Sequence, residues 1–254
     1  MKLLKAMAIA FSIYSKIPVP QFEWKEEDME YMMCFFPWIG GVIGLFFFGW
    51  AVLCKKFAVG NVCYALIGAA IPLMISGGFH VDGYMDTMDA FHSYQSREKK
   101  LEILKDSHIG AFAAIMLALY YMIDIAAISE IHTQKAVSAL AAVFFLARCF
   151  SGIAVMTLQP AKKEGLLYTF ASSAQKVRVK AALYFQAALC VVLMLLVSGW
   201  YGAAAIGAAL LSFFYFKKKS YKELGGITGD TAGFFVTVCE AAAAAAVAVA
   251  EYFL

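Results

Sequence analysis

Three aspartates lie close together in one short polar stretch, at Asp82, Asp86 and Asp89. Their spacings of four and three residues place all three carboxylates on one face of a helix. Like charges in such a row repel one another unless a cation lies between them. Oxygen ligands without cysteine suit a hard divalent ion, and Mg²⁺ is usually held by a few carboxylates together with substrate phosphate. The pattern predicts a Mg²⁺ site for a phosphorylated substrate; the plain alternative is a solvated acidic loop.

Two glycine-rich segments could bring backbone close to such a substrate. Gly77 and Gly78 precede the aspartates, and a backbone without Cβ atoms permits close approach to a ligand. Gly229 belongs to a second segment, in which Thr228 or Asp230 could cap the last apolar helix and leave free N–H groups for an anion. We therefore expect Gly77, Gly78 and Gly229 to contact the substrate.

A third polar segment, Lys105 to His108, comes directly before an apolar run. The cation of Lys105 and the hydroxyl of Ser107 suit phosphate, and Asp106 could join the metal. His108 lies at the same place. The alternative for Lys105 is anchoring at the membrane interface, with its long side chain reaching toward water.

The composition excludes an ordinary soluble domain. Of the 254 residues, 63% are hydrophobic and 15% are charged, whereas soluble domains carry about 25% charged residues. Lipid must therefore solvate much of the chain. The net charge of +3 and the lack of a long Lys/Arg run exclude a nucleic-acid partner. The six cysteines show no CxxC spacing and predict buried thiols rather than a disulfide framework.

Apolar runs of about 20 residues predict membrane-spanning helices. The candidate spans are residues 36–54, 57–79, 109–131, 136–157, 181–198, 201–216 and 231–250. The fifth and sixth can be read as one hairpin around Gly199. Because the sixth run is short, the expected number of spans is six or seven. An N-terminal interfacial helix, stopped by Pro18 and Pro20, precedes them. The predicted fold is an all-α transmembrane bundle in a single domain, residues 1–254.

The positive charges are distributed unevenly among the connections. Seventeen of the 21 Lys and Arg residues lie in the N-terminal segment and in the loops 80–108, 158–180 and 217–229. The positive-inside rule places these segments in the cytoplasm, so we expect a multi-pass cell-membrane protein with its reactive loops on that side.

Three ionisable residues lie inside the predicted spans: Asp124, Arg148 and Glu240. A charge in lipid is costly alone, so each needs a partner. Arg148 could pair with Asp124 or with Glu240, and a structural ion pair competes with a catalytic role.

The central motifs are similar to those of a known family. Residues 77–90, GGFHVDGYMDTMDA, followed by residues 99–110, KKLEILKDSHIG, resemble the cobalamin-5′-phosphate synthase family, also called adenosylcobinamide-GDP ribazoletransferase. The resemblance runs over nearly the whole chain and includes Ile17–Pro20, Phe36–Gly40 and Gly225–Asp230.

The resemblance implies a Mg²⁺-dependent reaction of two small molecules, a corrinoid and a nucleoside. Adenosylcobinamide-GDP and α-ribazole, or its 5′-phosphate, would give adenosylcobalamin, or its phosphate, and GMP. The three aspartates would hold Mg²⁺ on the diphosphate, and a carboxylate or His80 would accept the hydroxyl proton. Lys105 and Arg148 are candidates for stabilising phosphate charge. Asp106, His108 and Asp230 complete the expected catalytic residues, and a homo-oligomer is compatible with the sequence.

Two other functions fit parts of the pattern. A transporter of a divalent metal or small anion would also contain intramembrane acids and broken spans, but it should place carboxylates near the midplane and show inverted repeats. A lipid-head-group phosphotransferase also places several aspartates at a helix end beside an Asp-Gly pair. Its pattern continues with Ala-Arg and further aspartates, which this sequence lacks.

Overall fold

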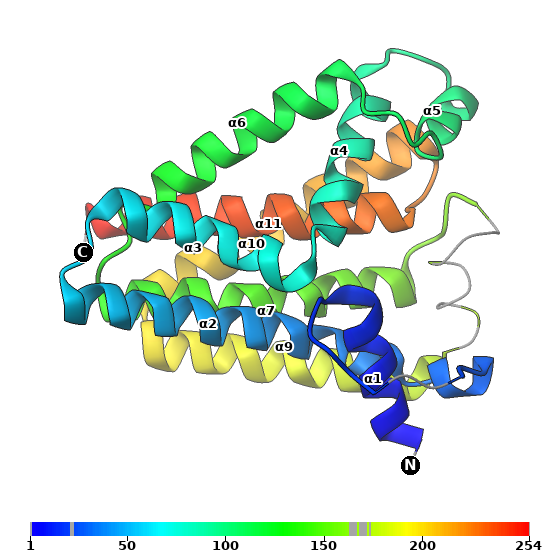
Figure 1. Ribbon diagram of the computed structural model, residues 1–254. Coiled ribbons are helices and arrows are strands. Elements are labelled where there is room, and N and C mark those ends of the chain that lie inside the picture. The colour runs from blue at the N-terminus through cyan, green and yellow to red at the C-terminus, as the bar shows by residue number, and fades with distance from the viewer. Residues whose placement is uncertain (1, 21–22, 163–166, 168–171, 173, 254) are drawn as a thin grey trace.

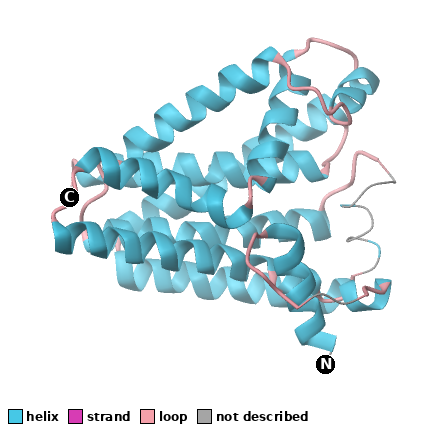
Figure 2. Cartoon of the chain, in the orientation of Figure 1, coloured by secondary structure: helices cyan, strands magenta, loops and turns pink. Residues whose placement is uncertain are grey.

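The structure is a computed structural model that describes all residues except 1, 21–22, 163–166, 168–171, 173 and 254. Within this described part, every regular element is a helix (Figure 2). The extended backbone includes one isolated bridge, between Pro160 and Ile227. The all-α prediction is confirmed.

Five helices are long and apolar enough to cross a membrane. They are α2 (Phe36–Phe57), α6 (Ala111–Ile128), α7 (Gln134–Thr157), α9 (Lys176–Ser198) and α11 (Gly229–Glu251). The bent pair α3 (Asn61–Ser76) and α4 (Phe79–His92) makes a sixth if it counts as one span. The hairpin expected around Gly199 is present, with α10 (Trp200–Leu224) following α9, but α10 is not among the five. By length and composition, the described helices thus give five spans, or six with the bent pair, where the sequence predicted six or seven.

The expected span over residues 57–79 is interrupted rather than straight. Helix α3 has 16 residues and ends at Ser76, and α4 leaves it at an angle of 96°. Gly77 and Gly78 form the corner with φ values of +65° and +84°, a conformation that costs glycine little and other residues more. The two glycines therefore turn the chain and direct the acidic helix α4 away from the axis of α3.

Two short helices at the chain's polar segments agree with the sequence. Helix α1 (Lys2–Tyr14) ends before the prolines, and α5 (Arg97–Ile103) is a short surface helix, which Leu101, Ile103 and Leu104 among charged residues favour. In α1, Ile9 and Ala10 are buried, whereas Leu3 and Leu4 are exposed by 57% and 68%. This two-sided helix suits the membrane interface, and its position there stays a prediction.

Helices α7 and α11 form the centre of the bundle. In the apolar stretch of 18 residues within each helix, 78% of the residues of α7 and 72% of those of α11 are buried, compared with 22% in α6 and 28% in α9. Gly40 and Gly44 of α2 lie directly against the α7 carbonyls of Phe144 and Ala141, where a Cβ atom would clash. The outer helices therefore present apolar side chains to lipid, while α7 and α11 are shielded by protein.

The polar connections gather at one end of the bundle. In Figure 1, α1, α5 and the loop entering α11 lie at one end, and the C-terminus lies at the opposite end with the α2–α3 and α6–α7 connections. The described parts of the lysine-rich segments thus share one end, as the charge pattern predicts. Which side of a membrane this end faces stays a prediction.

Candidate active site

Helices α4 and α11 touch backbone to backbone beside the aspartates. A Cβ atom on Gly83 would lie 2.8 Å from the carbonyl oxygen of Asp230, and one on Gly233 would lie 3.1 Å from that of His80. Only glycine permits this approach at Gly83, because real Cβ atoms do not come so close to backbone atoms. The crossing brings Asp82 of α4 to the first turn of α11, where Asp230 lies.

We expect Gly83→Ala to lower stability by about 1–3 kcal/mol, because the added methyl group overpacks the crossing. The matched control is Gly49→Ala in α2, where a Cβ would meet no heavy atom within 4 Å and where alanine improves helix propensity by up to about 1 kcal/mol. Thermal unfolding of the purified proteins in detergent measures both. Equal behaviour of the two variants would contradict the tight crossing.

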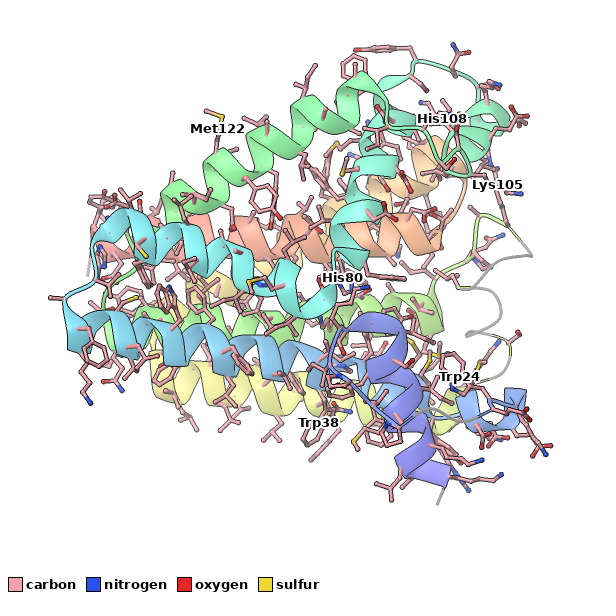
Figure 3. The ribbon with its side chains drawn as sticks, in the orientation of Figure 1. Trp24, Trp38, His80, Lys105, His108 and Met122 are labelled. Atoms are coloured by element: carbon pink, nitrogen blue, oxygen red, sulfur yellow. The ribbon has the colours of Figure 1, made fainter. Side chains whose placement is uncertain are left out.

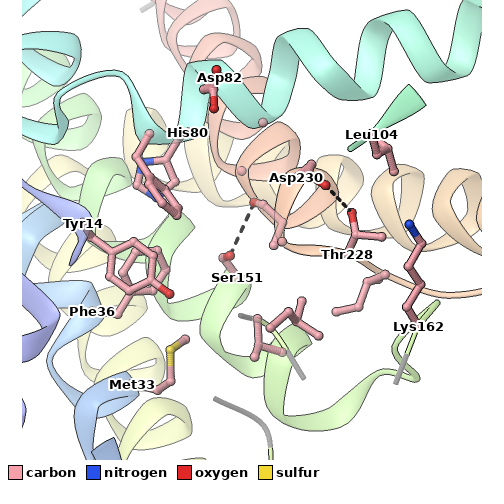
Figure 4. Close-up of a pocket in the computed structure, with 18 of the residues that line it drawn as sticks. Tyr14, Met33, Phe36, His80, Asp82, Leu104, Ser151, Lys162, Thr228 and Asp230 are labelled. Atoms are coloured by element: carbon pink, nitrogen blue, oxygen red, sulfur yellow. Dashed lines mark hydrogen bonds between the residues drawn. The ribbon is translucent and has the colours of Figure 1, made fainter. Parts of the chain in front are cut away.

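A cavity of about 500 Å³ lies beside this crossing. Its polar end combines two carboxylates with two lysines and a hydroxyl, supplied by Asp82, Asp230, Lys105, Lys162 and Thr228. Its other end is aromatic and contains the side chains of Tyr14, Phe36, Phe79 and His80. Figure 4 shows Tyr14 and Phe36 on one side of Ser151 and Thr228, Asp230 and Lys162 on the other, with Asp82 above Ser151 and close to His80.

The carboxylate of Asp230 is held at the start of α11. Thr228 caps this helix by accepting a hydrogen bond from the N–H of Thr231 at 3.1 Å, as the sequence suggested for this position. The hydroxyl of Thr228 also donates to Asp230 at 3.3 Å. Gly229 lines the same cavity. The helix N-terminus, with its unsatisfied N–H groups and partial positive charge, therefore opens toward the polar end.

Lys162 reaches the cavity through backbone pairing that sequence analysis did not detect. The N–H of Ala161 donates to the Ile227 carbonyl at 2.8 Å, and the N–H of Ile227 donates to the Gln159 carbonyl at 3.0 Å. The ammonium group of Lys162 donates to the carbonyl of Leu101 at 2.6 Å. No periodicity marks such a pairing of two loops; the signal that could have found Lys162 was the resemblance of its segment to the middle region of the family.

Helix α5 positions the loop that carries Lys105. The buried ammonium of Lys100 pairs with Glu223 at the end of α10, and Lys219 joins the same carboxylate at 3.0 Å. The hydrogen bond from Lys100 lowers the pKa of Glu223, so the carboxylate that pairs with the two lysines is charged at neutral pH. The chain then continues to Lys105, which lines the cavity; its phosphate-binding role stays a prediction.

The three aspartates of α4 have different surroundings. Asp82 lines the cavity and lies within the electrostatic reach of Asp230. Asp89 accepts hydrogen bonds from the N–H groups of Gly110 at 2.7 Å and Ala113 at 2.9 Å, so it caps the start of α6. Asp86 lies between, among the charges of the others. The cavity thus combines Asp82 with Asp230, and Asp89 has a structural role that the spacing did not reveal.

A metal site built from protein ligands alone is not present in the described residues. No group of three or more His, Cys, Asp or Glu side chains among them is placed to hold an ion. The two carboxylates at the cavity offer hard oxygen donors, which suit Mg²⁺ when substrate phosphates supply further ligands. The residues therefore fit a metal shared with a substrate and not a dedicated cage.

The residues Asp106, Ser107 and His108 lie outside the cavity. All three are exposed, and the Asp106 carboxylate contacts the His108 ring at 2.6 Å. This hydrogen bond lowers the pKa of Asp106. Figure 3 shows His108 at the outer end of the bundle and His80 nearer its middle. The structure does not bring these three residues to the polar end, and their catalytic role stays a prediction.

Arg148 lies inside the bundle rather than at the cavity. Its side chain is 1% exposed, and it donates to Glu240 at 2.7 Å and to the carbonyl of Phe144 at 2.8 Å. Of the two partners that the sequence left open, the structure selects Glu240. Asp124 is also buried and lies within the electrostatic reach of Glu240. The arginine therefore joins α7 to α11 and is not among the residues that line the cavity; its expected role in substrate binding stays a prediction.

A second cavity of about 540 Å³ lies on the other side of the α3–α4 corner. Gly77 and Gly78 line it, so these glycines border a cavity, though not the one with the lysines. Phe79 and Asp82 line both cavities. The start of α4 thus borders two cavities.

The chain is similar to known proteins over almost its full length. The family model for cobalamin-5-phosphate synthase matches residues 6–248. An adenosylcobinamide-GDP ribazoletransferase of Lachnoclostridium phytofermentans is 44% identical over 251 residues, covering 99% of this chain and 96% of the relative. Proteins with the same description from Clostridium botulinum strain Eklund 17B and Azorhizobium caulinodans are 34% and 30% identical, over 94% and 95% of this chain and 94% of each relative. No solved structure matches the chain. The chain belongs to the cobalamin-5-phosphate synthase family.

Proposed function

We propose that this protein is an adenosylcobinamide-GDP ribazoletransferase. It joins adenosylcobinamide-GDP to α-ribazole, or to its 5′-phosphate, and releases GMP. The observation that carries the proposal is that Asp82 and Asp230 line one cavity together with Lys105 and Lys162, in a chain of this family. The relatives' names support this activity over the transporter and the lipid-head-group phosphotransferase.

The reaction is a phosphoryl transfer, which depends on alignment and charge neutralisation more than on covalent chemistry. The ribose hydroxyl of the acceptor attacks the phosphorus bonded to cobinamide, and GMP leaves with the electrons of the broken P–O bond. Lys105, Lys162 and the N-terminus of α11 stabilise the negative charge that develops on the phosphate oxygens. Asp82 or Asp230 accepts the proton of the hydroxyl group.

Mg²⁺ belongs to this proposal as the counterion of the diphosphate. Asp82 and Asp230 would hold it, with Asp86 adding negative charge close by. When bound, the ion would neutralise negative charge on the diphosphate, together with Lys105 and Lys162. In this proposal Asp89 is left out of the ligand set, since its carboxylate already accepts two N–H groups at the start of α6; the sequence expected it to hold the ion, and that expectation is tested by substitution.

The proposal is tested by supplying purified protein in liposomes with adenosylcobinamide-GDP, α-ribazole and Mg²⁺. We expect one GMP to be released for each corrinoid product formed, and no GMP when α-ribazole is omitted. Release of CMP from a CDP-activated alcohol, or uptake of metal by the liposomes with no GMP released, would replace the proposal with one of the alternatives.

We further propose that the cavity faces the cytoplasm from a multi-pass position in the plasma membrane, with corrinoid and nucleoside substrates arriving from that side. The lysine-rich end of the bundle supports this orientation. On a cysteine-free background, cysteines at Gln95 and Lys222 should resist an impermeant thiol reagent added to intact cells. A cysteine at Asn61, at the opposite end, should react. Labelling at Gln95 with protection at Asn61 would reverse the orientation.

A further inference from the structure

One imidazole at the wall of the principal cavity lacks a protein partner. The side chain of His80 is 5% exposed, and neither ring nitrogen has a hydrogen-bond partner among the described residues. Buried polar groups in folded proteins are almost always hydrogen-bonded, because an unsatisfied one loses its hydration without compensation. Since His80 lines the cavity, the missing partner is naturally a group on a ligand bound there.

Aromatic rings from three helices surround this imidazole. Phe36 of α2 lies 5.6 Å from the His80 ring, centroid to centroid, and Tyr14 of α1 lies 6.2 Å from it at an interplanar angle of 14°. Tyr14 and Phe36 are 4.5 Å apart, and Phe79 meets Tyr14 edge-on. Such ring faces bind flat aromatic ligands by stacking, and this kind of contact accepts different bases.

The aromatic cluster and the charged residues lie on different sides of the cavity, and this layout matches that of a nucleotide. Figure 4 shows the Tyr14 and Phe36 rings at one side of the cavity and Lys162, Thr228 and Asp230 at the other. A nucleotide has the same division, with a flat apolar base at one end and phosphate at the other. A ligand whose phosphate contacts the lysines therefore directs its base toward His80.

We propose that the aromatic end of the cavity, formed by Tyr14, Phe36, Phe79 and His80, binds the flat heteroaromatic base of a nucleoside, with the His80 imidazole hydrogen-bonded to that base. The inference rests on the proposed function, in which both substrates carry such a base: guanine on the corrinoid donor and the base of α-ribazole on the acceptor. His80 is then a binding residue, whereas the sequence suggested it as a proton acceptor.

The test compares Phe36→Leu and His80→Phe with the control Phe47→Leu. Phe47 is another fully buried phenylalanine of α2 that packs on Phe144 and does not line the cavity. Binding of GMP and of α-ribazole to each purified protein is measured by calorimetry. We expect both test variants to bind one of these two ligands at least about tenfold more weakly than wild type, on the scale of one lost stacking or hydrogen-bonding contact. The ligand affected identifies whose base occupies the site.

Two results would overturn the proposal. The first is an unchanged affinity for GMP and for α-ribazole in both test variants. The second is a Phe47→Leu control whose affinity for either ligand falls as much as that of the test variants. His80→Phe retains a ring and serves as the test if Phe36→Leu does not fold. The binding measurement needs no catalytic turnover, so a failure of the base site can be distinguished from a failure of the proposed enzymatic activity. If the wild-type protein binds GMP or α-ribazole through these residues but releases no GMP in the activity assay, the ribazoletransferase activity is refuted and the base site stands.

Discussion

Replacing Asp82 or Asp230 by asparagine should lower the rate of GMP release at least about a hundredfold, the scale of losing one key electrostatic group in an active site. Asparagine preserves the size of each side chain but removes the charge that offsets a metal ion or accepts a proton. The protein should remain folded, because both aspartates lie close to other carboxylates and each substitution relieves repulsion.

Asp89→Asn provides the matched control within the same helix. Its carboxylate is bonded to the N–H groups of Gly110 and Ala113, and asparagine keeps one acceptor oxygen for them. We expect it to lower stability by about 0.5–2 kcal/mol, as loss of a helix cap does, with activity close to wild type once the protein is folded.

Metal dependence separates the roles of the two active-site carboxylates. A variant that has lost a metal ligand should regain part of its rate at high Mg²⁺ or with Mn²⁺, whereas one that has lost the proton acceptor should not. GMP release measured against metal concentration for each variant decides between them. Wild-type rates and metal dependence in both Asp82→Asn and Asp230→Asn would show that the polar end of the cavity is not the active site.

The second large effect is expected at Arg148, where replacement by alanine should lower stability by about 3–5 kcal/mol. The guanidinium group is 1% exposed and pairs with Glu240 across the interface between α7 and α11. Its removal leaves a carboxylate buried without compensation. Unfolding in detergent or in liposomes measures the loss.

The double variant Arg148→Ala with Glu240→Gln should recover part of this stability, because a neutral amide costs less to bury than an unpaired charge. Arg178→Ala is the control, since Arg178 lies at an exposed position and donates to the hydroxyl of Tyr31; it should change stability little. An Arg148→Ala protein with wild-type stability and no activity would move this arginine from the structural core to the active site.

Several features of this protein followed from local sequence alone. Apolar runs that water cannot solvate predicted the membrane helices, although the corner that Gly77 and Gly78 form after α3 was not predicted. The Thr228 cap and the surface helix α5 were also readable, because a cap or a short amphipathic turn depends on residues only a few positions apart. Family motifs in the same local stretches identified the reaction class.

The composition of the site was decided by tertiary structure. Asp82 is combined with Asp230 because Gly83 and Gly233 let two helices distant in sequence touch. Lys162 arrives through the pairing of Ala161 with Ile227, and Asp89 is diverted to cap α6. Helical spacing states which side chains share a face, but it does not state what lies opposite that face. The partners of a carboxylate depend on close packing between separate helices, and this packing is a property of the assembled bundle rather than of any one segment.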